Sequence, residues 1–136
     1  MVYFNVMMKT ELSVKETERA LAGELRDVLA VVPTVEVRSL DIERPGDAPR
    51  VDIIADVSIA SRSFTILMEV KSSGQPRVIR SAVDQALQAA ANLGMKSIVL
   101  VGAPYMADSA RRLCDEAGVG WLDLAGNVRI VGPGLY

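Results

Sequence analysis

The sequence contains no histidine and only one cysteine, and both shortages narrow the chemistry that it can perform. Without histidine, Ser-His-Asp and Cys-His catalysis, histidine acid-base chemistry and the usual zinc sites are excluded. The single cysteine, Cys114, cannot form an internal disulfide and fits a reducing compartment, so we expect a cytoplasmic protein. Cys114 lies in an apolar helical stripe, which favours a core residue over a nucleophile. A catalytic site must therefore use carboxylates, lysine, arginine and hydroxyls.

Long apolar runs and a strong charge of one sign are also missing. No run approaches the roughly 18 residues of a membrane span, and residues 1–9 lack the basic start and cleavage site of a signal peptide. We interpret residues 1–9 as an extra strand or a docking arm. The net charge of −2 over 136 residues excludes a strongly basic coat for nucleic acid, so a phosphate partner must meet local positive charge. The length predicts one soluble globular domain over 1–136, which can be the first domain of a longer protein.

Hydrophobic periodicity predicts an α/β domain. An amphipathic stripe predicts a helix over about 14–31, begun by a capping box of Ser13 and Glu16 and ended before Pro33. Alternation at a period of two predicts a hairpin. The expected elements are a helix over 14–31, a strand over 34–42, a hairpin of 51–59 and 64–71, a helix over 76–92 closed by Gly94, a strand over 97–101, a helix over 106–117 and a hairpin of 119–124 and 128–131.

The first hairpin gathers charged residues on one face. Asp52, Asp56, Glu69 and Lys71 share one parity, and a turn centred near Ser61 and Arg62 would place Lys71 opposite Asp52 and Glu69 opposite Ile54. Side chains across or diagonal on a hairpin lie roughly 5 to 8 Å apart, so two carboxylates can share one ion. Mg²⁺, or Mn²⁺ in its place, suits this set because it takes few carboxylates and completes its shell with water and phosphate oxygens.

These residues resemble a known family. Arg50-Val51-Asp52-Ile53-Ile54-Ala55 and Ile66-Leu67-Met68-Glu69-Val70-Lys71 look like the core of the PD-(D/E)XK, or restriction-endonuclease-like, superfamily. The resemblance implies an αβββαβ core with a mixed central sheet flanked by helices, here followed by a helix and a hairpin, and Mg²⁺-dependent cleavage of DNA or RNA. It also implies that Asp52 and Glu69 are metal ligands, that the Val70 carbonyl is a further ligand, and that Lys71 is the catalytic lysine. Val51 replaces the proline of the motif, and Asp56 competes with Asp52 for the first acidic role.

Other polar residues are candidates for the same site. Glu18 falls inside the apolar stripe of the first helix and matches the glutamate that many family members place there. Arg77 and Arg80 open the helix after Lys71 and, with Arg50, are expected to contact phosphate. Gln85 matches a glutamine of some members, although it lies opposite the apolar stripe. Each of these residues can equally be an ordinary surface or helix-edge side chain.

The sequence leaves two functions open. The first is Mg²⁺-dependent hydrolysis of DNA phosphodiesters, and the second is a catalytically silent module of the same fold that binds nucleic acid or protein. A homodimer and a further C-terminal domain are both compatible with the chain. Trp121 is expected to pack the last hairpin rather than stack on a base, and residues 123–127 are best explained by turn chemistry, with a second polar cluster near the site left open.

Overall fold

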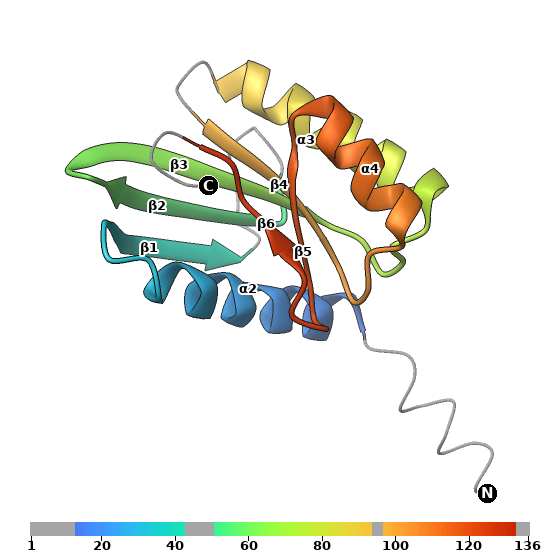
Figure 1. Cartoon of the computed structure of the whole chain (residues 1–136), viewed down its shortest axis with the longest axis horizontal. Helices are drawn as coiled ribbons and strands as arrows, with labels where there is room; N and C mark the ends of the chain where they lie inside the picture. The colour runs from blue at the N-terminus through green and yellow to red at the C-terminus, as the bar shows by residue number, and fades with distance from the viewer. Residues whose placement is uncertain (1–12, 43–50, 94–96, 133–136) are drawn as a thin grey trace, which may run out of the picture.

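Within the residues that the computed structural model describes, 13–42, 51–93 and 97–132, six strands form one sheet in the order β1-β2-β3-β4-β5-β6 (Figure 1). The strands are β1 (Val35–Ile42), β2 (Ile53–Ile59), β3 (Arg62–Val70), β4 (Ser97–Ala103), β5 (Gly120–Asp123) and β6 (Val128–Arg129). The helices are α2 (Val14–Ala30), α3 (Pro76–Leu93) and α4 (Asp108–Ala117). This order confirms the predicted α/β class and its αβββαβ core with a further helix and hairpin.

The sheet is mixed. The pairs β1–β2, β2–β3 and β5–β6 are antiparallel, whereas β3–β4 and β4–β5 are parallel. Because β3, β4 and β5 run in one direction, their carboxyl ends meet at one edge of the sheet. The loops that follow Val70, Ala103 and Asp123 therefore lie at that edge, which is the usual place for a site in an α/β sheet.

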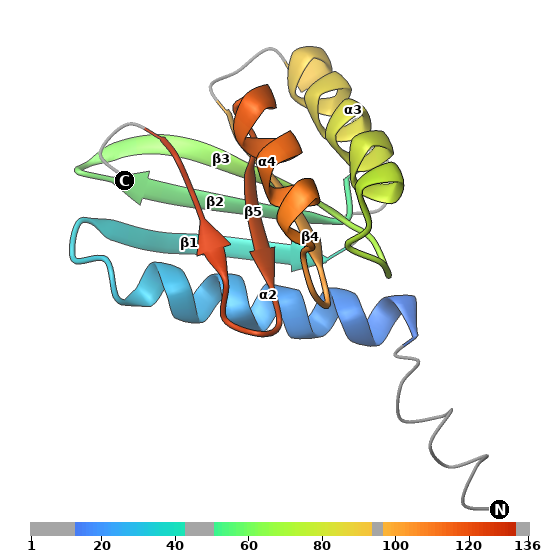
Figure 2. The same cartoon turned by 45° about the vertical axis from the view of Figure 1, so that its right-hand side comes forward.

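Helices cover both faces of the sheet, with α2 on one side and α3 and α4 on the other (Figures 1 and 2). On the α2 side, Leu21, Leu25 and Leu29 pack against alternate residues of β2 and β3. On the other side, Ile54 and Leu67 pack with Ala89 of α3. This double cover explains why β2 and β3 are buried at almost every position. In the described parts of the chain, the helices are too short or too polar to cross a membrane.

The β2–β3 turn corrects the predicted register. Ile59 pairs with Arg62, so the turn consists of Ala60 and Ser61, one residue earlier than expected. Both turn residues have positive φ, 49° and 69°, as a two-residue hairpin turn requires. The prediction that Lys71 lies opposite Asp52 is therefore wrong, and so is the pairing of Glu69 with Ile54, which pairs with Leu67. The earlier turn moves both strands by one residue relative to the prediction, so Asp52, Glu69 and Lys71 still share one face.

Most predicted element ends are within two residues of the observed ones. The Ser13 hydroxyl accepts a hydrogen bond from the Glu16 N–H at 3.1 Å, which confirms the predicted helix start. The third helix begins at Asp108 rather than Met106, because Met106 is a fully buried loop residue whose N–H is bound to a side chain. Residues 1–9, Arg50 and Gly94 lie outside the described residues.

Candidate metal centre

Asp52 joins the start of β2 to the end of β3. Its Oδ2 accepts a hydrogen bond from the Val70 N–H at 2.7 Å. Ile53 pairs with Met68, and the same register continued by one residue places Asp52 opposite Glu69. The backbone bond fixes the Asp52 carboxylate at the carboxyl end of β3, beside the Glu69 side chain.

Glu69 is buried in an unfavourable environment. It is 9% exposed, and its Oε2 has no hydrogen-bond partner among the described residues. The pKa of Glu69 rises from its ordinary 4.5 to about 8, first because burial desolvates the carboxylate and then because of the charge of Asp52 and a side-chain hydrogen bond with it. The Lys71 ammonium acts in the opposite direction. Near neutral pH the Glu69 carboxyl group therefore holds a proton, and a cation in place of that proton would relieve the same repulsion.

Lys71 follows directly after β3. Its N–H donates to the Gly102 carbonyl at 2.9 Å, which extends the β3–β4 ladder to the lysine. The ammonium is close enough to Glu69 to lower the pKa of that carboxyl group. Glu69, Lys71 and Asp52 therefore lie together at one strand end. The N–H of Val70 binds Asp52, and the ligand role of its carbonyl stays a prediction.

Glu18 lies near the same end of the fold. It is 1% exposed, in agreement with its place in the apolar stripe of α2. One turn further along, Leu21 packs so closely on β4 that a methyl group at Gly102 would meet it at 3.0 Å, and Gly102 is paired with Val70. Figure 1 shows the first turn of α2 on the side of the molecule where β3 ends. A role for Glu18 in the site stays a prediction.

Asp56 is separated from the Asp52–Glu69 pair. Its carboxylate accepts hydrogen bonds from Ser39 at 3.1 Å and from Thr65 at 3.3 Å. Four residues of extended chain place it about 13 Å from Asp52. The structure thus does not bring Asp56 to the pair, and the described residues contain no group of three or more acidic or cysteine side chains arranged to hold a metal. Among the described residues, the carboxylates that the structure brings together at this strand end are Asp52 and Glu69.

The residues expected to contact nucleic acid are exposed where they are described. Arg77 and Arg80 lie on the first turns of α3, six and nine residues after Lys71 along the chain, and both are exposed. Gln85 is also exposed, away from the buried positions of α3. These side chains are accessible to a bound strand, and their contacts stay predictions.

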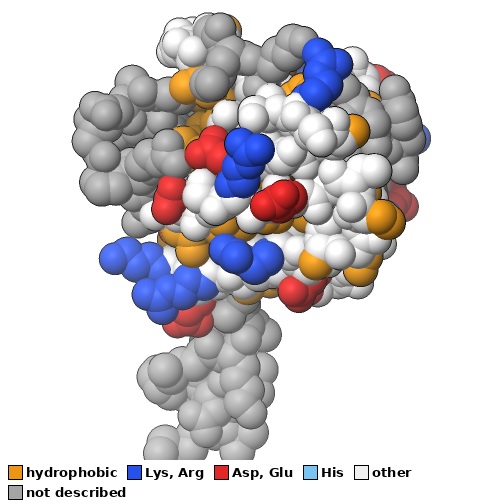
Figure 3. Space-filling model, turned by 90° about the vertical axis from the view of Figure 1, so that its left-hand side faces the viewer, with side chains coloured by type: hydrophobic (Ala, Val, Ile, Leu, Met, Phe, Trp, Pro, Cys, Tyr) orange, Lys and Arg blue, Asp and Glu red, His pale blue; other side chains and the backbone are white. Residues whose placement is uncertain are grey.

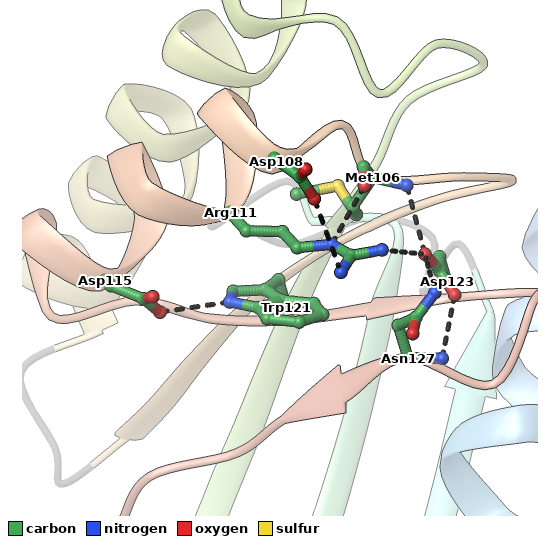
Figure 4. Close-up of polar contacts among 7 residues, drawn as sticks. All are labelled: Met106, Asp108, Arg111, Asp115, Trp121, Asp123 and Asn127. Atoms are coloured by element: carbon green, nitrogen blue, oxygen red, sulfur yellow. Dashed lines mark hydrogen bonds and ion pairs between the residues drawn. The ribbon is translucent and has the colours of Figure 1, made fainter.

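A second polar cluster surrounds Asp123, at the carboxyl end of β5 (Figure 4). Asp123 is fully buried and accepts hydrogen bonds from the N–H groups of Met106, Ala125 and Asn127 and from the Asn127 side chain, at 2.9 to 3.1 Å. Arg111 lies 3.7 Å away. The bonds to residues 125 and 127 agree with turn chemistry, and the bonds to Met106 and Arg111 are the tertiary part that the sequence analysis missed.

An apolar groove lies elsewhere, between the end of α2 and β6. It has a volume of about 450 Å³ and is lined by Val28, Leu29, Val32, Val128, Arg129, Ile130 and Val131. Figure 3 views the side of the molecule where α2 ends, and hydrophobic side chains reach the surface there between charged ones. The lining has one arginine and no carboxylate or nucleophile, so the groove lacks the groups of a hydrolytic site.

Cys114 is not a candidate nucleophile. It is fully buried in α4, and burial raises the pKa of its thiol to about 12, with the charge of Asp115 adding to this shift. A thiol with this pKa holds its proton at neutral pH. The predicted core role of Cys114 is confirmed.

Comparison with solved structures finds partial likenesses. A repair endonuclease from Pyrococcus abyssi matches with a TM-score of 0.49 and 17% identity, over 75% of this chain and 46% of that one. EndoMS, solved in a complex with dsDNA, matches with a TM-score of 0.46 and 20% identity, over 83% of this chain and 47% of that one. SfsA of Pyrococcus furiosus, solved with Ca²⁺, matches with a TM-score of 0.33 and 11% identity, over 80% of this chain and 58% of that one. The chain thus spans about half the length of the two endonucleases. No family model and no curated protein matches it.

Proposed function

We propose that this domain hydrolyses phosphodiester bonds of DNA with Mg²⁺ or Mn²⁺. The site lies at the carboxyl ends of the neighbouring strands β3 and β4. The observation that carries the proposal is the close pair of Asp52 and Glu69, in which Glu69 Oε2 is buried and has no hydrogen-bond partner within the described part of the chain. Two hard oxygen donors at a desolvated site suit Mg²⁺, which takes one or two carboxylates and fills its shell with water and phosphate.

The chain's own residues would divide the work as follows. Asp52 and Glu69 would hold the ion, with the Val70 carbonyl as a further donor and Glu18 at the border of the site. The ion would activate a water and neutralise charge on the phosphate. Hydrolysis joins a water oxygen to phosphorus while the bond to the leaving oxygen breaks, so negative charge grows on the phosphoryl group. Lys71 would stabilise this charge, because its ammonium lies beside Glu69.

Positive charge next to the pair would position the strand. Arg77 and Arg80 are exposed on the helix that follows Lys71, and phosphate contacts of this kind fix register without reading sequence. Arg50, three residues before the start of β2 in sequence, would contribute a further positive charge. Gln85 would contact the strand further along α3. The single buried cysteine fits the reducing cytoplasm that we propose as the site of action.

One observation favours a second function. Within the described ranges the site has two carboxylates and lacks a third in reach of the same ion. A domain with this set that fails to hold an ion would be a catalytically silent module of the same fold, binding nucleic acid through its arginines or serving as a protein interaction domain.

Replacing Lys71 separates the two functions. We expect wild-type protein to cleave plasmid or single-stranded DNA in Mg²⁺ or Mn²⁺ and not in EDTA, and Lys71→Ala and Lys71→Met to cleave about 10² to 10³ times more slowly, a loss of about 2.7 to 4 kcal/mol of transition-state stabilisation. Metal binding should be unchanged or tighter, because a positive charge is removed from beside the carboxylates.

A matched control lies at the other end of the same strand. Arg62→Ala also removes one positive charge, but Arg62 is exposed beside the Ala60–Ser61 turn, nine residues and about 30 Å from Lys71. Its cleavage rate should equal that of wild type. Absence of metal-dependent cleavage in wild type, with Lys71→Ala weakening DNA binding by about one phosphate contact and a shallower salt dependence, would instead identify the silent module.

A further inference from the structure

Three loops meet at the carboxyl edge of the sheet beside the proposed metal centre. The loop after β4 packs on the loop after Lys71, where the Ala107 N–H donates to the Gly74 carbonyl at 3.2 Å. The approach is so close that a methyl group at Gly74 would collide with the Tyr105 carbonyl oxygen. On its other side, the β4 loop is tied to β5, because the Leu124 N–H donates to the Pro104 carbonyl at 3.1 Å.

Tyr105, in the middle loop, has a ring that is exposed and supported from beneath. It is 57% exposed, in a chain with only 4% aromatic residues. The Arg111 guanidinium lies over the ring, 5.5 Å from its centroid. Since this cation covers one face, the exposed surface belongs to the opposite face and the edge. Tyr105 therefore offers an aromatic face to a ligand at the edge where the metal centre lies.

The support beneath Tyr105 is rigid. Arg111 donates from Nε to the Met106 carbonyl at 2.9 Å and pairs with Asp123 and Asp108 at 3.7 Å each. Its guanidinium also lies 5.1 Å from the centroid of the Trp121 ring, as the close approach in Figure 4 shows. The buried Asp123 carboxylate holds the Met106 N–H at 3.1 Å, which fixes the residue after Tyr105. A ring held in place in this way loses little conformational entropy when it binds.

Position and chemistry together define the ligand. Gly74 lies three residues after Lys71, so the contact with Tyr105 is at most about 11 Å of chain from the lysine. A strand with its phosphate at Lys71 would pass Tyr105 within a few nucleotides. Every nucleobase has a π-face that stacks on an aromatic ring, but bases paired within a duplex are already stacked on their neighbours and cannot reach it.

We propose that Tyr105 is a stacking platform for an unpaired nucleobase, so that the preferred substrate is DNA with a single-stranded segment beside the cleaved phosphate. The cleavage part of this statement rests on the function proposed above, whereas the stacking part stands on the Tyr105–Arg111 geometry. A lone surface tyrosine without this role would tolerate removal of its ring.

The test measures binding in EDTA, where no cleavage occurs. Tyr105→Ala should bind a single-stranded oligonucleotide roughly ten- to a hundredfold more weakly than wild type, the loss of one base–aromatic stack, and Tyr105→Phe should bind as wild type does. An abasic oligonucleotide has the same phosphates but no bases, so wild type should bind it as weakly as Tyr105→Ala binds the normal strand. Leu87→Ala, which removes another exposed apolar side chain, at 41% exposure on α3, is the control and should change nothing.

A fluorescent variant reports the contact directly. Tyr105→Trp keeps an aromatic ring at the edge, and its emission should fall when the single-stranded oligonucleotide is added and stay constant with the abasic one. Equal affinity of wild type and Tyr105→Ala for the normal strand would overturn the platform, even if wild type cleaves DNA with metal. Conversely, base-dependent binding through Tyr105 without any cleavage would support the platform and overturn the nuclease.

Discussion

Two buried carboxylates at the same edge of the sheet, Asp123 and Glu69, are stabilised in opposite ways. Asp123 is 0% exposed, and its two oxygens accept four hydrogen bonds and face Arg111. Glu69 is 9% exposed, faces a second carboxylate and has an oxygen without a hydrogen-bond partner in the described structure. The first carboxylate has the partners that a buried charge needs, whereas the second is compensated only in part, by the Lys71 ammonium.

The difference is the one expected between a structural acid, Asp123, and the metal-ligand acid that we propose for Glu69. Asp123 ties the loops after β4 and β5 together through its hydrogen bonds, so it stabilises the folded state. Burial and the charge of Asp52 raise the pKa of Glu69, and the Lys71 ammonium, which acts in the opposite direction, does not cancel them. Strained polar groups of this kind gather at functional sites, because the missing partner is supplied by a ligand.

Removing the Asp123 carboxylate should have the largest effect. Asp123→Ala leaves three backbone N–H groups and the Arg111 guanidinium without their acceptor in the interior, so we expect the free energy of unfolding to fall by about 3 to 5 kcal/mol. Asp123→Asn keeps one acceptor oxygen and should lose less. Urea denaturation followed by circular dichroism measures both. A change below 1 kcal/mol in Asp123→Ala, which about equals a single ordinary hydrogen bond, would contradict the structural role.

Replacing Glu69 by an uncharged residue should instead raise the free energy of unfolding. Its pKa is about 8 in the folded protein and 4.5 ordinarily, so the folded state binds more protons between these values and the free energy of unfolding falls as pH rises from 4.5 to 8. At pH 7 this costs on the order of 3 kcal/mol in the absence of metal. Glu69→Gln should recover stability and flatten the pH dependence over this window, as measured by urea denaturation at several pH values. Wild-type stability that is level from pH 5 to 8 would show that Glu69 is not strained.

The sequence was sufficient to predict that Asp52 and Glu69 share one face of the hairpin, but not that they lie opposite each other. Parity along β2 and β3 places Asp52 and Glu69 on one face for any two-residue turn, because moving such a turn by one residue shifts the sum of paired positions by two. For this reason the wrong turn position gave a wrong partner for Lys71 but the right face. Ala60 and Ser61 are not the glycine or asparagine that usually mark a two-residue turn, so their positive φ was not visible in the sequence.

The second site could not be predicted to the same extent. The bonds of Asp123 to residues 125 and 127 are local and follow from turn chemistry. Its contacts with Met106 and Arg111 join elements that are separate in sequence, and they depend on how α4 packs against β5. An aspartate among the apolar residues of a strand was the available signal. Without an expected position for Arg111, that signal could not identify a partner for Asp123. Tyr105 belongs to no sequence pattern that would have marked it as a candidate.

Metal binding should stabilise the strained pair. A cation that binds only the folded state adds about 2.7 kcal/mol at a hundredfold excess over its Kd, so saturating Mn²⁺ or Mg²⁺ should raise the melting temperature. Because the ion replaces the proton of Glu69, the affinity should rise up to tenfold per pH unit below pH 8 and level off above it. Asp52→Asn and Glu69→Gln should remove the shift, while Asp56→Asn, at the separate acid, should keep it. An equal shift in all variants would place the ion elsewhere.

The smallest expected effect lies at the rim of the Asp123 cluster, in Trp121. Its indole N–H donates to Asp115 at 3.0 Å, and Asp115 is also paired with Arg129 at 3.0 Å. Trp121→Phe keeps a ring beneath Arg111, leaves Asp115 its arginine and loses one hydrogen bond and some buried area, so the free energy of unfolding should fall by about 1 to 2 kcal/mol. Because Trp121 belongs to the satisfied cluster, the loss should be the same at pH 5 and pH 8, and the melting shift on adding Mn²⁺ should be unchanged. A loss that varies with pH, or a weaker metal shift, would mean that the two carboxylate regions are coupled through the loops at their shared edge.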